Sequence, residues 1–188
     1  MTNIQSSGPS VGSFRALAET SEAVVLKGGD LKATSATPAK QGFLGSAVQW
    51  IKTLLGAGPH KANEQTRAAF TAALTQNYGQ GISEAALHQV KTQQDNDKPL
   101  NSRDIKAVLD RADQLMSLRN DAAQCKLALI EASAKRDMKL FTLEMKAEAK
   151  GISVPKLMKL SIGSEAFLAQ QRADEAQQKF KAELFKKD

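Results

Sequence analysis

Apolar residues recur at steps of three and four along the middle of the chain, which is the spacing of one face of an α-helix. The pattern extends from Phe43 to Leu115 and is divided by breaks that contain Gly or Pro. It predicts four helices, over 42–55, over 63–78, from Ser83 onward and from Asn101 onward. We therefore expect residues 42–117 to form a four-helix domain.

Two of these helices have the spacing of a hydrophobic staple, in which the residue before the N-cap packs on the fourth helical residue. The pairs are Ile82 with Leu87 around Ser83, and Leu100 with Ile105 around Asn101. This spacing predicts that Ser83 and Asn101 are N-caps.

Residues 118–150 contain no Gly or Pro and carry a further apolar stripe at near-heptad spacing. The stripe is Ala123, Leu127, Ile130, Ala134, Met138, Phe141, Met145 and, at its polar end, Glu148. An unbroken helix from Ser102 to Lys150 would be roughly 70 Å long at about 1.5 Å per residue. The sequence leaves open whether the helix is unbroken or a new one begins at Asn120.

A last helix is predicted after a turn over 151–163, with Ser164 as its N-cap. Its stripe is Ala166, Ala169, Ala173, Ala176, Phe180 and Leu184. We expect this stripe to face the stripe of the preceding helix in an antiparallel hairpin over 118–188.

The N-terminal segment has a different character from the rest. Residues 1–13 are uncharged and rich in Ser, Gly, Asn and Thr, which predicts disorder, and 14–22 have the composition of a short helix. Residues 23–26 form a β-prone run closed by Gly28 and Gly29. An isolated strand makes no sheet, so this run is either a loop or a strand that pairs with another protein. Residues 31–41 have the composition of a linker, so we expect residues 1–41 to be a disordered arm. With no sheet expected within the chain, the predicted fold class is all-α.

The composition narrows the functional classes. Aromatic residues make up 5% of the chain and the formal net charge is +6, with acidic and basic residues interleaved in the C-terminal half. A mixed-sign helical surface is usually solvated, and a basic face with interleaved aromatics is missing, so nucleic acid is not an expected partner. The N-terminus lacks the basic and apolar regions of a Sec signal peptide. The longest apolar stretch is too short to span a bilayer.

Catalytic and metal-binding patterns are weak. Cys125, the single cysteine, lies on a predicted helix and has the character of a packing or surface residue. His60 lies in a turn and His88 on a helix, and neither has the spacing of a metal ligand or a catalytic base. We expect neither enzymatic activity nor a cofactor or metal.

The block from residue 43 to 115 nevertheless resembles a known family. The shared features are VQWIKTLLG over 48–56, an F-x-x-A-L-x-x-x-Y-G pattern over 70–79, AAL over 85–87 and KPLNSR over 98–103. In order and spacing they are similar to the N-terminal chaperone-binding region of the SptP family of type III secretion effectors. Members of that family end in GTPase-activating and tyrosine phosphatase domains.

The resemblance implies how this chain is delivered. In that family the N-terminal segment wraps around a dimeric secretion chaperone and adds a short strand to the chaperone's sheet. The chaperone-binding residues implied here are Val24, Val25, Leu26, Phe43, Leu44, Trp50, Ile51 and Leu54. Cys125 stands in CKLALIE, which lacks the Cys-x5-Arg phosphatase signature, so the resemblance does not carry over that activity. GSFRAL over 12–17 faintly resembles the arginine-finger loop of bacterial GTPase-activating effectors, but such a finger acts only when a rigid domain holds it.

Our expectation is therefore a small, mostly helical type III-secreted effector or secretion-associated protein. It would act as a virulence factor in the host cell, through protein–protein contacts with an unknown host protein, after delivery by a chaperone dimer. The expected partner-binding residues are Leu127, Ile130, Phe141, Met145, Phe180 and Leu184. The alternative is a membrane-associated helical protein that places the amphipathic helix over 43–55 on a lipid surface.

Overall fold

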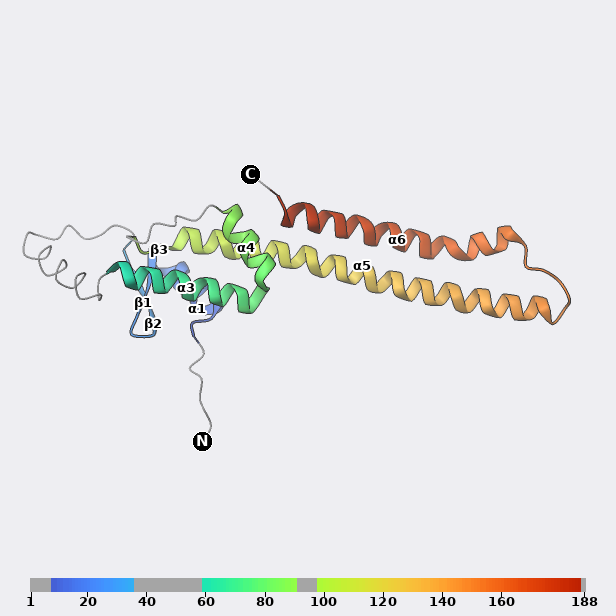
Figure 1. Ribbon diagram of the computed structural model, residues 1–188, viewed down its shortest axis with the longest axis horizontal. Helices are drawn as coiled ribbons and strands as arrows, with labels where there is room; N and C mark the ends of the chain where they lie inside the picture. Colours follow the sequence, from blue (N-terminus) through green and yellow to red (C-terminus); the bar gives the residue numbers. More distant parts are fainter. Residues whose placement is uncertain (1–7, 36–58, 91–97, 187–188) are drawn as a thin grey trace, which may run out of the picture. The chain divides into compact units, whose positions relative to one another are not determined.

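The computed structural model describes residues 8–35, 59–90 and 98–186. These residues form five helices and a three-stranded antiparallel sheet, so the fold is mostly α rather than all-α (Figure 1). They pack into two units, unit 1 up to Gln114 and unit 2 from Leu115 to Lys186. The helix expected over 42–55 lies outside the described residues.

The N-terminal segment is an ordered part of unit 1, so the expectation of a disordered arm is wrong for residues 8–35. Helix α1 (Val11–Thr20) has Ser10 as its N-cap, and the Ser10 Oγ accepts a hydrogen bond from the Ser13 N–H at 3.2 Å. Strands β1 (Ala23–Lys27) and β2 (Asp30–Thr34) follow as a hairpin. Gly28 and Gly29 link them with φ of 63° and 91°, and a type I′ turn requires positive φ at both central positions.

Strand β1 is the central strand of the sheet rather than an unpaired one. The order is β2-β1-β3, and β3 consists of Leu100 and Asn101, which pair with Val24 and Ala23. The sequence pattern does not reveal this sheet, because β2 is largely polar and β3 has two residues, too few for a periodicity.

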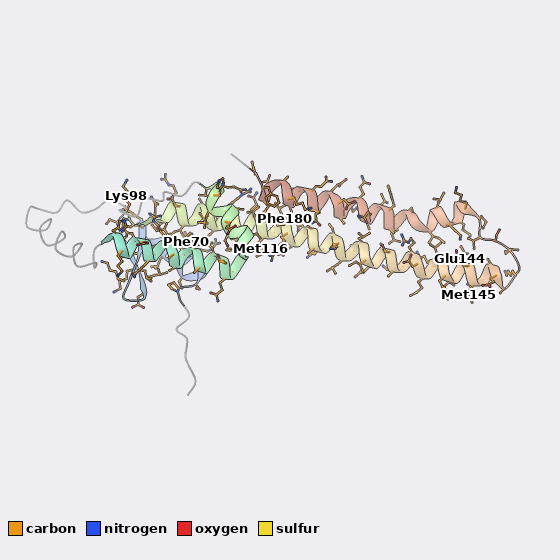
Figure 2. The ribbon with its side chains drawn as sticks, viewed as in Figure 1. Phe70, Lys98, Met116, Glu144, Met145 and Phe180 are labelled. Carbon is orange, nitrogen blue, oxygen red and sulfur yellow. The ribbon has the colours of Figure 1, made fainter. Side chains whose placement is uncertain are left out.

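Helix α3 (Pro59–Tyr78) packs on β1 and α1, and its predicted stripe is confirmed. Phe70, Ala73, Leu74 and Tyr78 are all buried. Phe70 lies on α3 (Figure 2). Its ring meets the fully buried Phe14 ring of α1 with centroids 5.0 Å apart and an interplanar angle of 59°. This tilted pair joins the N-terminal segment to the core.

Helix α4 (Gln80–Gln89) begins three residues before the predicted cap, so Ser83 is not an N-cap. Its hydroxyl donates instead to the Gly79 carbonyl at 2.8 Å, and Ile82 is a buried helical residue, so the predicted staple does not form. Gly79 precedes the helix with φ of 83°, a conformation that glycine adopts without strain. The local turn at Gly79 therefore determines where α4 begins.

Helix α5 (Ser102–Glu148) begins as predicted and is unbroken over 47 residues. The Asn101 Oδ1 accepts from the Arg103 N–H at 2.8 Å, and Ile105, Val108, Leu109, Ala112 and Leu115 are buried. The helix ends in a Schellman motif, in which the Ile152 N–H reaches the Ala147 carbonyl at 3.0 Å and the Gly151 N–H reaches Glu148 at 2.9 Å. Gly151 adopts φ of 66° in this motif.

Helix α6 (Lys156–Leu184) begins eight residues before the predicted cap. Pro155 precedes its first turn, while Gly163 and Ser164 are interior helical residues, so the predicted turn over 151–163 is too long. The two helices of unit 2 lie side by side and antiparallel, as expected for a hairpin (Figure 1).

The seam of this hairpin uses a different face of α5 from the predicted one. The α6 stripe is buried or half-buried as expected, but the α5 stripe from Ala123 to Met145 is exposed. From Leu118 on, the residues of α5 that are buried or half-buried are Leu118, Ala122, Cys125, Leu129, Ala132, Ser133, Arg136, Leu140, Leu143 and Ala147. Both sets have helical spacing, so α5 carries two apolar faces in unit 2, and the one with small residues meets the alanines of α6.

Candidate interaction surfaces

A cluster of polar side chains joins three helices of unit 1. The Arg15 Nη2 lies 2.6 Å from the Asp113 Oδ2, and the Tyr78 hydroxyl donates to the Asp113 Oδ1 at 2.6 Å. Arg15 also lies 3.6 Å from Asp110. Burial raises the pKa of the Tyr78 phenol, and its hydrogen bond to the Asp113 carboxylate raises it further. With its guanidinium between two carboxylates, Arg15 holds α1 on α5.

The structure places the predicted strand contacts inside unit 1. Val24 and Val25 are buried, and Leu26 is half-buried. The Leu26 N–H donates to the Thr66 Oγ1 of α3 at 2.7 Å. In this fold β1 has a neighbour on each side, so pairing with another protein's sheet would require it to leave the core. Phe43, Leu44, Trp50, Ile51 and Leu54, the other predicted chaperone contacts, lie outside the described residues.

One exposed apolar surface is the α5 outer stripe, which we define as Ala123, Leu127, Ile130, Ala134, Met138, Phe141 and Met145. Its five large side chains are between 52% and 71% exposed. Four of the six predicted partner-binding residues lie in this stripe, namely Leu127, Ile130, Phe141 and Met145. The other two, Phe180 and Leu184, are half-buried on the inner stripe of α6 and belong to a different surface.

A second surface is an open groove of about 620 Å³ along one side of the hairpin. Met138 and Leu143 of α5 and Met158 and Ile162 of α6 supply its apolar lining. Lys135, Lys139 and Lys146 line the same groove. Within the described ranges no carboxylate lies in ion-pair distance of these three lysines, unlike Lys159, which pairs with Glu144. We call this surface the lysine groove. Sequence reasoning missed it, because it depends on which side of α5 faces α6.

Candidate chemistry is sparse in the described parts of the chain. No group of three or more His, Cys, Asp or Glu residues there has the arrangement of a metal site. Cys125 is a free thiol, half-buried on the side of α5 that faces α6. Of the helices that the structure describes, none combines the length and apolarity needed to cross a bilayer.

Three comparisons, with protein-family models, with curated proteins and with solved structures, give no match to this chain. The two surfaces of unit 2 and the sequence resemblance are therefore the features from which a function can be inferred.

Proposed function

We propose that this chain is a non-catalytic interaction protein that binds an acidic amphipathic helix of a partner in the lysine groove. The observation that carries the proposal is the combination of an apolar lining with Lys135, Lys139 and Lys146. An amphipathic helix inserts its apolar side into such a groove, while its carboxylates pair with the lysines.

We further propose that the protein is a type III secretion substrate that acts in the host cell after chaperone-assisted delivery. This part is supported by the similarity of residues 48–56, 70–79, 85–87 and 98–103 to the SptP family. It also agrees with a binding role, because a delivered interaction protein needs an exposed surface rather than a catalytic centre.

Binding is tested with a photo-crosslinking residue in place of Thr142, which lies in the groove. The full chain is incubated with host-cell extract, and each crosslinked protein is identified. We expect a partner with an acidic amphipathic helix, and at least a tenfold loss of crosslinking in the double variant K139E/K146E. The matched control is K179E/K181E, which reverses the charge at two exposed lysines of α6 that lie outside the groove. Equal crosslinking in both double variants would contradict the proposed groove.

Delivery is tested by export of the full chain from bacteria with and without a working type III apparatus. A deletion of residues 2–42 is unsuitable, since it removes Phe14 and β1 from the core of unit 1. A reporter protein fused after residues 1–42 tests whether this segment acts as a secretion signal without requiring unit 1 to fold. The reporter alone is the control. Retention of the full chain and the fusion in both strains would refute this part of the proposal.

A further inference from the structure

The α5 outer stripe has a symmetric spacing that the lysine groove does not explain. Its positions 123, 127, 130, 134, 138, 141 and 145 are separated by steps of 4, 3, 4 and again 4, 3, 4. The spacing reads the same from either end, with Ala134 at the centre. Asn120 and Glu148, at the next positions outward, are polar, so the apolar stripe ends at equal distances from Ala134.

We propose that the occupant of this stripe is a second copy of the chain, in which α5 packs antiparallel on α5 across a twofold axis at Ala134. Every stripe residue then meets a stripe residue of the other copy. Ala134 meets its own counterpart, Ile130 meets Met138, Leu127 meets Phe141, and Ala123 meets Met145. Small residues at the centre let the two helices approach closely, and such an interface is self-complementary by construction.

The charges beside the stripe also fit this register. In an antiparallel pair, equivalent flanks of the two helices face each other, and their charges select partner and orientation. On one flank Glu131 meets Lys135 of the other copy and Gln124 meets Thr142. On the other flank Lys126 meets Glu144, which also binds Lys159 of its own chain, and Ser133 meets Asp137. No pair brings two like charges together.

A parallel pairing in the same stripe fits less well. It joins Lys126 with Glu131 of the other copy, but it leaves Lys135 and Glu144 without a cross-chain counterpart. A parallel pairing also places each stripe residue against the same residue of the other copy, so Phe141 meets the other Phe141 and Ala123 meets the other Ala123. The antiparallel arrangement combines a larger with a smaller side chain in each layer away from the axis.

The exposed area is sufficient for a specific but weak association. A fully exposed large apolar side chain presents on the order of 200 Å². The five large side chains, 52–71% exposed, therefore present roughly 600 Å² per copy. If all of this area becomes buried, two copies together reach about 1,200 Å², the lower end of specific interfaces, where weak and transient associations lie.

The first measurement is sedimentation equilibrium of the full chain from about 1 to 200 μM, a range suited to a weak and reversible association. We expect a monomer–dimer equilibrium that Ala134→Glu shifts to monomer, because two carboxylates then meet at the axis. Ala128→Glu is the matched control, an exposed alanine of the same helix outside the stripe. Circular dichroism confirms that both variants keep their helices. A monomeric wild type, or a dimer that Ala134→Glu leaves intact, overturns the proposal.

The orientation is tested by disulfide trapping in a Cys125→Ser background. Equal amounts of Ile130→Cys and Met138→Cys chains are mixed and oxidised. Antiparallel packing predicts disulfides mainly between the two different chains, since positions 130 and 138 face each other across the axis. Crosslinks confined to like chains would show parallel packing and overturn the register. The α5 pair and the lysine groove share Met138 and, on the flank of the pair, Lys135 and Thr142. The sedimentation and trapping experiments contain only the purified chain, so their outcome does not depend on whether a partner helix binds the groove.

Discussion

Replacing Phe14 by alanine tests whether the N-terminal segment is part of the folded core. The side chain is 0% exposed and packs on the Phe70 ring at 5.0 Å. Removal of a buried phenylalanine costs about 3–5 kcal/mol, including the cavity that remains. Small domains are stable by about 5–15 kcal/mol, so the variant loses a large part of the stability of unit 1.

Hydrogen–deuterium exchange of the full chain locates this loss. Since each 1.4 kcal/mol corresponds to a factor of ten, amides in α1, β1 and β2 should exchange about 100-fold faster or more. The control is Phe185→Ala, the same substitution at a side chain that is 72% exposed, where we expect a change within about 0.5 kcal/mol. Peptides from 156–184 provide an internal reference in both variants. If residues 11–34 exchange equally fast in both variants, Phe14 does not anchor this segment and our account of unit 1 is wrong.

Two further perturbations test the polar cluster and the hairpin turn. Tyr78→Phe removes the hydrogen bond to the charged Asp113, so we expect about 1.5–3 kcal/mol of destabilisation at pH 7, measured by urea unfolding. The raised pKa of Tyr78 means that its contribution is complete below the unfolded value of about 10 and falls as the pH rises through the folded value. The difference between wild type and Tyr78→Phe should therefore shrink above pH 10, and a constant difference would show that the phenol is not the source. Gly151→Ala should lower the melting temperature, because a left-handed conformation costs an alanine about 1–2 kcal/mol of stability. Gly163→Ala should raise the melting temperature, because alanine is more stable than glycine inside a helix by about 0.5–1 kcal/mol. Effects of the same sign would contradict the helix boundaries of the hairpin.

The sequence predicts the helical elements of this fold well, where side-chain periodicity alone determines the buried face. The stripe of α3 around Phe70 and the start of α5 at Asn101 are both confirmed, because each depends on residues within one or two turns. The sheet is not predictable in this way. β1 is central because it pairs with Leu100, more than seventy residues away, and no local pattern encodes that partner.

The interaction surfaces of unit 2 also depend on packing that a local sequence pattern does not encode. A helix with one apolar stripe indicates its buried face, but α5 has two, and the stripe with the larger residues is the exposed one. The alanines of α6 determine which face of α5 is buried, since they pack on the face that contains Ala132 and Ala147. The lysine groove follows from that choice and so could not be predicted beforehand. The cluster of Arg15, Tyr78 and Asp113 likewise joins three distant segments and has no sequence motif.

The partners of the N-terminal segment also have a consequence for synthesis. Arg15 binds Asp113, 98 residues later, and Ala23 pairs with Asn101. At about 5–20 residues per second, a ribosome needs roughly 4 to 16 s to advance from residue 35 to residue 113. During that interval α1, β1 and β2 lack their native contacts with β3 and with Asp113 of α5. The first segment to be made is thus among the last to complete its contacts, and a protein that binds it in its extended form would compete with folding during this time.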